Sequence, residues 1–355
     1  MYQIPKFFDI IPNMIFNNKK ISLVSIGDIA IDAFIRIKEA SEVCSINSEA
    51  CQLCLSFANK IPYEFDEIIP AVGNSANAAV AGAKLGLSSL LIAHIGKDKN
   101  GTDCLNSLKK SGVNISRIYS HKEKRTNYHY VLWYGPERTI LVKHEEFPYH
   151  LPKFSKPDWM YLSSMGSNSV EYHKAIENYL LKNTSVKLAF QPGTFQMKMG
   201  TEALKNIYAR TEIFICNVEE AKLITEAETL APGRAGGQAK DIRTLSEKLI
   251  ALGPKIIVIT DGPKGSYSFD GEKLLFIDVY PQEPAYERTG AGDSYSTTFM
   301  TAVAYGENIE TAMKWASVNS MNVCKYVGSQ KGLLTIPEIK VYLDKAGADW
   351  TTKIM

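Results

Sequence analysis

Three residues with almost no side chain precede an acidic residue in the stretch ERTGAGDSYSTTF, residues 287–299. Gly290, Ala291 and Gly292 leave their backbone N–H groups open, and Asp293 begins a predicted helix. Backbone amides at a helix N-terminus attract anions, and a carboxylate in the same place repels them unless it has a functional role there. Phosphoryl transfer is a reaction that gives it such a role, because the reaction uses hydrogen-bond donors around the moving phosphoryl group and a base for the attacking hydroxyl. Capping of the helix is the competing role for Asp293.

Further motifs join this turn in one pattern. GAGD resembles the second signature of the ribokinase-like carbohydrate kinases, the PfkB family, and AVGNSANAAVAGAKLG (71–86) is similar to the first. IGDIAIDAF, HIGKDKNG, FICNVEEAKLI and VITDGPKGSYSF follow other motifs of this family, in family order and at predicted strand ends. Each motif is weak by itself. The joint match is specific and covers about residues 21–335.

The resemblance assigns one group of residues to the substrate. Gly73 and Asn77 match family positions that hold sugar hydroxyls, through close backbone approach and an amide that both donates and accepts. Asn74 belongs to the same signature. Asp32, five residues after the glycine that ends the first predicted strand, matches an aspartate that grips substrate hydroxyls. Asp28 competes for that role, and helix packing through Ala and Gly is the alternative for 71–86.

The resemblance assigns the GAGD turn to catalysis. In the family this turn forms an anion hole, and its aspartate takes the proton of the substrate hydroxyl. Carried over, the amides of Gly290, Ala291 and Gly292 form the hole and Asp293 is the general base.

A third group is expected to meet ATP and Mg²⁺. Asn217 and Glu220 match the family's N-x-x-E motif, which organises Mg²⁺ and phosphates, often through water. Because Mg²⁺ keeps several waters, one carboxylate and one amide suffice. Thr260, Gly262 and Gly265 match the family's nucleotide loop, for which a plain hairpin turn is the alternative.

The chain departs from the family pattern at three places. Val72 stands where the family usually has a glycine. Glu287 and Arg288 precede GAGD where an aspartate and a small residue are common. In some members that aspartate helps to build a monovalent-cation site, so the departure leaves K⁺ activation open for this chain. Thr297 and Thr298 replace a small pair, which is expected to change helix packing and leave the base unchanged.

Apolar runs alternate with helical patterns along most of the chain. Buried parallel strands are predicted at 21–27, 89–96, 158–164, 186–192, 212–217 and 255–262. This alternation, with the resemblance, predicts a ribokinase-like three-layer α/β/α fold, a doubly wound and mostly parallel sheet with a small β-rich lid.

The predicted lid comes from two insertions, 33–70 and 122–147, the second containing a hairpin around GPER. The kinase core is expected at 21–32, 71–121 and 148–355, after an N-terminal extension over 1–20. The lid is expected to exclude water from a ligand crevice, and a purely oligomerising insert is the alternative. Its exposed edges predict a homodimer through the lid.

The overall composition limits the kinds of binding partner and the cellular location that are expected for this chain. Lys plus Arg number 40 and Asp plus Glu 38 among 355 residues, a net charge of +2 that favours neither nucleic acid nor an anionic membrane. No window approaches the roughly 20 apolar residues of a membrane span, and residues 1–20 lack a signal-peptide pattern, so a cytoplasmic protein is expected. The six cysteines are expected to be plain thiols, although Cys51 and Cys54 form a C-x-x-C.

These residues together predict an enzyme. The expected reaction transfers the γ-phosphoryl group of ATP to a hydroxymethyl group of a small, ribose- or fructose-like sugar. Aromatic residues in the hairpin (Tyr128, Tyr130, Trp133 and Tyr134) keep a nucleoside kinase open as the alternative. A non-catalytic sugar- or nucleotide-binding regulator with the same fold is the third hypothesis. A dinucleotide-dependent dehydrogenase is excluded, because GDIAID follows the first strand where G-x-G-x-x-G is required.

Overall fold

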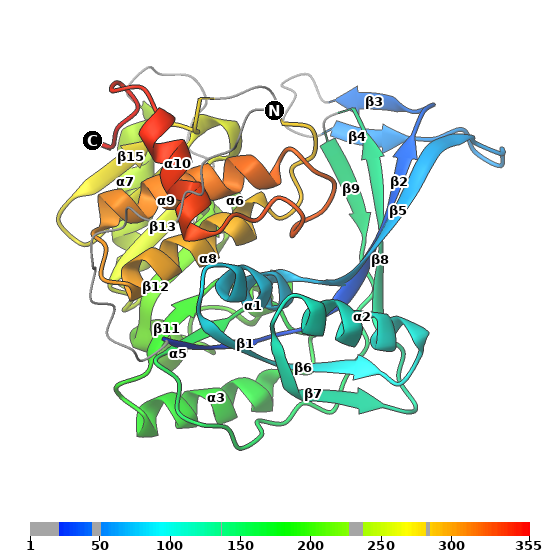
Figure 1. Cartoon of the computed structure of the whole chain (residues 1–355), viewed down its shortest axis with the longest axis horizontal. Helices are drawn as coiled ribbons and strands as arrows, with labels where there is room; N and C mark the ends of the chain where they lie inside the picture. The colour runs from blue at the N-terminus through cyan, green and yellow to red at the C-terminus, as the bar shows by residue number, and fades with distance from the viewer. Residues whose placement is uncertain (1–20, 45–50, 136, 227–236, 282–284) are drawn as a thin grey trace, which may run out of the picture.

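A large, mostly parallel sheet forms the centre of the computed structural model, which describes residues 21–44, 51–135, 137–226, 237–281 and 285–355 (Figure 1). The described strands of this sheet run in the order β16-β15-β14-β13-β12-β11-β10-β1-β6-β7. Their bounds are β16 Lys353–Ile354, β15 Leu274–Ile277, β14 Ser266–Phe269, β13 Ile256–Thr260, β12 Thr211–Asn217, β11 Lys187–Phe190, β10 Trp159–Leu162, β1 Ser22–Ile26, β6 Ser88–Gly96 and β7 Asn114–His121. The extension expected over 1–20 lies outside the described residues.

The strand order reverses beside β1. From β1 the chain proceeds outward to β6 and β7, and it then returns to β10 on the other side of β1 and continues to β13. All neighbours from β7 to β13 pair in parallel, and β14 to β16 add an antiparallel edge. The six predicted strands are therefore confirmed. In such sheets ligands bind at the carboxyl ends of the strands near the reversal.

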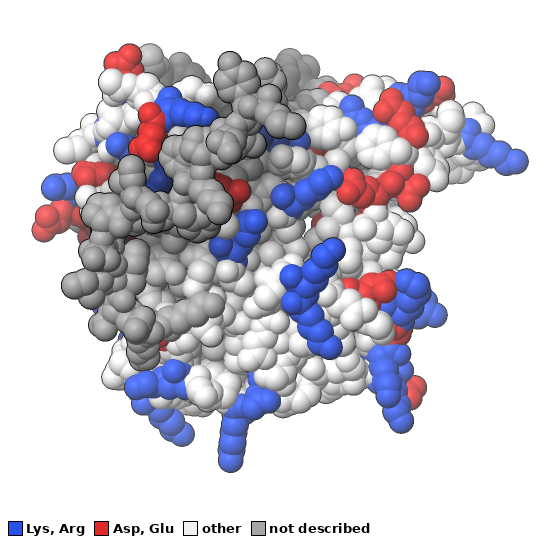
Figure 2. Space-filling model, viewed as in Figure 1, with Lys and Arg blue, Asp and Glu red and all other residues white. Residues whose placement is uncertain are grey.

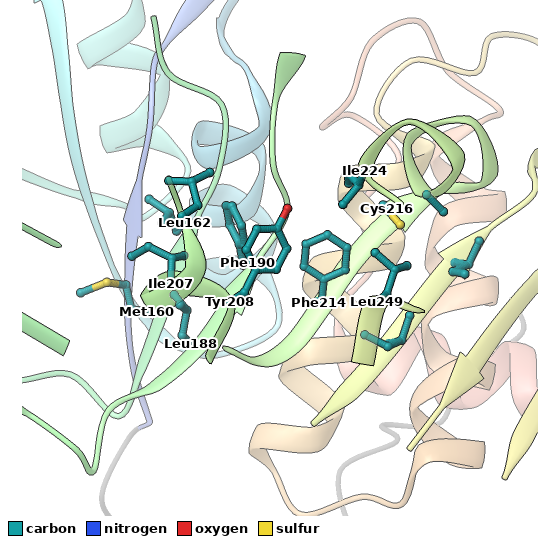
Figure 3. Packing of buried hydrophobic residues seen from close by; sticks show 14 of the residues in the cluster. Met160, Leu162, Leu188, Phe190, Ile207, Tyr208, Phe214, Cys216, Ile224 and Leu249 are labelled. Atoms are coloured by element: carbon teal, nitrogen blue, oxygen red, sulfur yellow. The ribbon is translucent and has the colours of Figure 1, made fainter. Parts of the chain in front are cut away.

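Helices cover both faces of this sheet. The described helices are α1 Asn74–Lys84, α2 Lys99–Lys110, α3 Val170–Lys182, α4 Thr194–Met199, α5 Lys205–Arg210, α6 Val218–Ile224, α7 Gly237–Ile250, α8 Ala291–Ala304, α9 Ile309–Val323 and α10 Ile336–Lys345. Residues of α3, α5, α6 and α7 pack into one core (Figure 3), and residues of α1, α8, α9 and α10 pack into a second on the opposite face.

Successive side chains of a central strand contribute in turn to the two hydrophobic cores. In β12, Phe214 and Cys216 belong to the first core, whereas Ile213 and Ile215 belong to the second. A strand that is apolar at every position is buried on both faces, as expected for a parallel sheet between two helical layers. The predicted three-layer α/β/α fold is confirmed.

A small sheet stands beside the core, at the right in Figure 1, and contains β5 Tyr63–Val72, β2 Ala30–Ile37, β8 Asn127–Tyr134 and β9 Glu137–Leu141 in that order. β2 pairs antiparallel with β5 and parallel with β8, and β8 and β9 form the predicted hairpin. Phe34, Val131 and Trp133 fill one face of it together with Val327 of the core.

A two-stranded ribbon, β3 Ser41–Cys44 and β4 Cys51–Cys54, extends from the small sheet. Cys44 and Cys51 face each other across this ribbon and form a disulfide, whereas Cys54 is free. The expectation of six plain thiols was wrong for this pair. The C-x-x-C motif pairs Cys51 with Cys54 in the sequence, whereas the antiparallel register of the ribbon places Cys51 opposite Cys44.

The surface carries both charge signs. On the face in Figure 2, basic side chains stand apart from one another with acidic ones among them. Within the described ranges, no helix is both long and apolar enough to cross a membrane.

Candidate active site

The GAGD turn begins α8 close to the point where the strand order reverses. Gly290 is the N-cap, in a left-handed conformation with φ of 80°. A Cβ at Gly290 would lie 2.1 Å from Cβ of Ser329, so both the backbone angle and the packing require glycine. Gly292 is exposed, and a Cβ there would meet no atom within 4 Å. The turn therefore combines a fixed backbone with open space beside Gly292, and the N–H of Ala291 donates to the carbonyl oxygen of Arg288 at 3.3 Å.

Three side-chain amides converge on the carboxylate of Asp293. Asn74 and Asn77, on the first turn of α1, donate from Nδ2 to Oδ1 at 3.0 Å and to Oδ2 at 2.7 Å. Gln191, directly after β11, donates from Nε2 to Oδ1 at 3.1 Å. Asp293 makes these bonds from inside the first turn of α8, so the structure uses its side chain as an acceptor for distant groups, and Gly290 takes the N-cap position.

Two hydrogen bonds to its carbonyl oxygen fix the orientation of the Asn77 side-chain amide. Its Oδ1 accepts a hydrogen bond of 2.7 Å from Ser329 Oγ and one of 2.9 Å from Gln330 Nε2. Since an amide has one accepting and one donating end, these two bonds turn its NH₂ toward Asp293. Sequence reasoning missed Ser329 and Gln330, which lie between α9 and α10 in a stretch without a motif.

Gln191 was also missed. Its side chain lies between Asp293 and the buried Tyr161 of β10, whose hydroxyl donates to Gln191 Oε1. One signal was available in the sequence: Gln191 is the first polar residue after a buried parallel strand, and such positions face the ligand crevice.

Neighbouring charges set the electrostatics of the carboxylate. Burial raises the pKa of Asp293 above its usual range, the three amide donors oppose that rise, and the negative charge of Asp32 adds to it. Burial also raises the pKa of Glu220, again with a contribution from Asp293. Asp293 therefore interacts through space with both Asp32 and Glu220, so the predicted base lies between the carboxylates predicted for the substrate and for the metal.

Asp32 and Asp28 both lie at the junction of the core and the small sheet. Asp32, on β2, faces His129 of β8, with 3.2 Å between Oδ1 and Nδ1. Asp28, just after β1, accepts from the Tyr149 hydroxyl at 2.8 Å and lies 3.3 Å from His144 Nδ1. The two imidazole rings are neighbours, with centroids 5.4 Å apart. Neither histidine was predicted.

Gly73 precedes α1 with φ of 106°, and a Cβ there would lie 2.8 Å from the carbonyl oxygen of Asp28. The glycine thus lets the start of α1 approach the end of β1. Val72 is buried and pairs with Ala30 between β5 and β2, so it packs inside the small sheet at this departure from the family pattern.

Asn217 and Glu220 form a reciprocal cap at the start of α6. Glu220 N donates to Asn217 Oδ1 at 2.8 Å, and Asn217 N donates to Glu220 Oε2 at 2.9 Å. A capping box of this kind satisfies two helix-end donors. Among the described residues, no group of three or more His, Cys, Asp or Glu is arranged to hold a metal ion.

The predicted nucleotide loop adjoins this cap, because Thr260 pairs with Asn217 at the ends of β13 and β12. Gly262 and Gly265 both have positive φ, 52° and 97°. A Cβ at Gly265 would lie 2.3 Å from the carbonyl oxygen of Ile277, whereas one at Gly262 would meet nothing within 4 Å. This turn joins β13 to β14, so the hairpin alternative describes its backbone correctly.

Glu287 and Thr298 also have defined hydrogen-bond partners. Glu287 is buried and accepts from Thr289 N and Oγ1 at 2.8 and 2.6 Å and from Gly328 N at 3.2 Å. Thr298 accepts from Asn319 of α9 at 2.8 Å, so its hydroxyl links α8 to α9.

Comparisons with known proteins identify the family. The family model for the pfkB family carbohydrate kinases matches residues 70–336, most of the chain. The chain belongs to the PfkB family of carbohydrate kinases. This PfkB kinase is 28% identical over 279 residues to ribokinase from Bacillus subtilis, covering 76% of this chain and 87% of that one.

Other relatives act on a different substrate class or show the fold. A nucleoside kinase from Methanothermobacter thermautotrophicus is 24% identical over 291 residues, covering 78% of this PfkB kinase and 85% of the relative. The structure of Arabidopsis thaliana ribokinase complexed with ribose and ATP superposes with a TM-score of 0.70 at 18% identity, over 92% of this chain and 99% of that one. At that identity the likeness shows the ribokinase fold.

Proposed function

We propose that this kinase transfers the γ-phosphoryl group of ATP to a hydroxymethyl group of a small, ribose- or fructose-like sugar. The observation that carries the proposal is the carboxylate of Asp293, which stands behind an open, glycine-rich helix N-terminus and faces two asparagines of α1. It fits a base that must meet both a hydroxyl and a phosphoryl group.

The chain's own residues suit an in-line transfer. Asn74, Asn77 and Asp32 offer two amides and one carboxylate, which can exchange their present partners for sugar hydroxyls. Asp293 takes the proton of the sugar hydroxyl while the hydroxyl oxygen bonds to the γ-phosphorus. The bond between the γ-phosphorus and the oxygen that it shares with the β-phosphate breaks in the same step. The amides of Gly290, Ala291 and Gly292 are the donors for the charge on the moving phosphoryl group.

ATP and Mg²⁺ belong to the other end of the site. We assign the nucleotide to the loop of Thr260, Gly262 and Gly265, and Mg²⁺ to Glu220 with Asn217, through water. The donor set fits, because a carboxylate and an amide oxygen are the hard ligands that Mg²⁺ prefers and it needs few from the protein. When bound there, Mg²⁺ would supply positive charge that offsets the negative charge of the phosphates.

The hairpin aromatics favour a sugar over a nucleoside. Side chains alternate between the faces of a strand, so Tyr128, Tyr130 and Tyr134 lie on the face of β8 opposite to that of His129, the partner of Asp32. Trp133 shares the face of His129 but is 1% exposed, beneath Arg36. A nucleobase stacked on the three tyrosines would not share the face that carries Asp32, and the buried Trp133 leaves no exposed ring face for a nucleobase.

The test is ADP release with Mg-ATP against free sugars, sugar phosphates and nucleosides, with Asp293→Asn beside the wild type. We expect turnover with one sugar class and a loss of about 10²–10⁴ in the variant, the usual worth of a positioned base. Turnover with nucleosides alone would support the nucleoside alternative. Binding of ATP or sugar without turnover would support the regulatory one.

We also propose a homodimer through the small sheet. Ile68, Tyr130 and Leu141 align with Ala33 in one cross-strand row and are 57%, 49% and 52% exposed. An apolar row of this kind is typical of a surface covered by a partner. A monomeric mass in solution would overturn this proposal.

A further inference from the structure

Gln191 forms a bridge between the base and the interior of the sheet. Its backbone N donates to the carbonyl oxygen of Leu162 at 3.0 Å, which continues the pairing of β11 with β10 beyond the strand end. From this fixed backbone the side chain reaches Asp293 Oδ1 with Nε2 and receives the Tyr161 hydroxyl on Oε1. Two neighbouring strands and α8 are thus linked through one amide.

Tyr161 determines which end of that amide faces the base. The tyrosine is fully buried, and burial raises its pKa, so the phenol remains a proton donor. A glutamine amide has an accepting oxygen at one end and a donating NH₂ at the other. Because the phenol occupies the oxygen, the NH₂ is directed to Asp293.

The two carboxylate oxygens of Asp293 are consequently unequal. Oδ1 receives donors from Asn74 and Gln191, whereas Oδ2 receives only the Asn77 donor among the hydrogen bonds of the described residues. The proposed function gives Asn74 and Asn77 to the sugar hydroxyls. Gln191, whose other end is held by a buried phenol, is the donor that stays on the base.

We propose that Gln191 is a positioning residue for the phosphoryl transfer: anchored by Tyr161, it holds Oδ1 of Asp293 as an acceptor and directs the substrate proton to Oδ2. In this step the substrate O–H bond breaks, the proton passes to Oδ2, and the freed oxygen bonds to the γ-phosphorus as ADP leaves. The inference rests on the proposed role of Asp293 as base.

Three titratable groups from other elements act on this carboxylate. Asp32 on β2 and Glu220 on α6 are acidic, and Tyr161 on β10 is neutral. Both acids favour a protonated Asp293, so the Gln191 donor works against them by stabilising the charged form. Removing that donor shifts the acid limb of the pH–rate profile to higher pH.

The experiment is the pH dependence of kcat/KM for the wild type, Gln191→Ala, Gln191→Glu, Tyr161→Phe and the Gln191→Ala/Tyr161→Phe double variant. Gln191→Ala is expected to lose about tenfold on the acid side and to recover at higher pH, because one pKa unit is a factor of ten in the ionised fraction. Gln191→Glu keeps the length and the acceptor for Tyr161, replaces the donor with a negative charge, and is expected to shift the limb further.

Tyr161→Phe is expected to shift the limb in the same direction by less. If the phenol acts through Gln191, the double variant shifts no further than Gln191→Ala alone. Thermal unfolding of each variant shows whether it is folded, and Gln191→Glu, which retains the shape of the side chain, keeps the test valid if the alanine variant is unstable.

Two outcomes would overturn the inference alone. An unmoved acid limb in Gln191→Ala and Gln191→Glu, with Asp293→Asn inactive, would show that the base works without this bridge. An unmoved limb with a raised KM would place Gln191 against the substrate. Full turnover by Asp293→Asn would instead remove the base and with it the proposed function.

Discussion

The two ends of the proposed site, the base end around Asp293 and the nucleotide end around Asn217 and Glu220, are built in opposite ways. At the base end, Asp293 bonds to residues 219, 216 and 102 positions away in the chain. At the nucleotide end, Asn217 and Glu220 bond to each other across three residues. The first arrangement exists only when α1, β11 and α8 have assembled, whereas the second is a property of one helix start.

Because of this difference, the two ends are expected to differ in how strongly substitutions elsewhere in the chain affect them. A local capping box contributes about 0.5–2 kcal/mol to its own helix and tolerates change elsewhere. A carboxylate that collects donors from three elements depends on the position of each of them, and an error of about 1 Å there reduces catalysis strongly. Equivalent substitutions at the two ends should therefore have unequal effects.

Among the residues that support the base, the largest effect is expected from Asn77→Ala. Its Nδ2 donates to Asp293, and its Oδ1 accepts from Ser329 and Gln330. Truncation frees the carboxylate and removes the acceptor of the buried Ser329 hydroxyl, whereas Gln330 Nε2 keeps the carbonyl oxygen of Ala71. We expect a loss of about 10²–10³ in kcat/KM, with roughly 1–3 kcal/mol of stability. Kinetics with Mg-ATP and denaturant unfolding measure the two quantities.

Asn217→Ala is the matched control, since it removes the same side chain from the nucleotide end. It should cost about 1 kcal/mol for the cap and about tenfold in activity, because Mg²⁺ fills its coordination with water. Equal catalytic losses for the two asparagines would contradict the contrast between the ends.

An intermediate effect is expected from Gly265→Ala. This variant tests whether the turn at the nucleotide end depends only on its own backbone or also on contacts with residues distant in the sequence. The φ of Gly265 is 97°, and a Cβ added there would lie 2.3 Å from the carbonyl oxygen of Ile277. Both features predict a loss of about 3 kcal/mol or more in the free energy of unfolding. Gly262→Ala, with φ of 52° and no atom within 4 Å, should lose about 1 kcal/mol. Similar losses in both variants would mean that the backbone angle alone matters there.

The same contrast explains what could be predicted from the sequence. Some predicted features depend on spacing within a short window: the parallel strands of the large sheet, the GAGD turn and the Asn217–Glu220 pair. Periodicity and capping chemistry are visible at that range. These parts of the fold and site were predicted.

The contacts that were missed join distant segments. Gln191 meets Asp293, and Ser329 meets Asn77, because strand order and register bring them together. His129 meets Asp32 through the parallel pairing of β8 with β2, which nothing in either strand specifies. The disulfide of Cys44 with Cys51 likewise depends on which residues face each other in a ribbon.

The smallest expected effect is a gain in stability for Glu220→Gln in the ligand-free protein. Burial raises the pKa of Glu220, so the folded state binds its proton more tightly than the unfolded state, and stability is lost as pH rises through that window. Above that window the cost is fully present, and a neutral glutamine, which still accepts from Asn217 N, removes it. The gain should be less than about 1 kcal/mol. Because the variant lacks the carboxylate assigned to Mg²⁺, its half-maximal turnover should need more Mg²⁺ than that of the wild type.

Asp293→Asn should not share this gain, although burial raises the pKa of Asp293 as well. Three N–H donors point at its carboxylate, and an asparagine would present its own NH₂ to at least one of them. The relief of a buried charge is then offset by an unpaired donor. Melting temperatures at pH 7 without ligand compare the two variants, and an equal rise in both would mean that desolvation outweighs the converging amides at the base end.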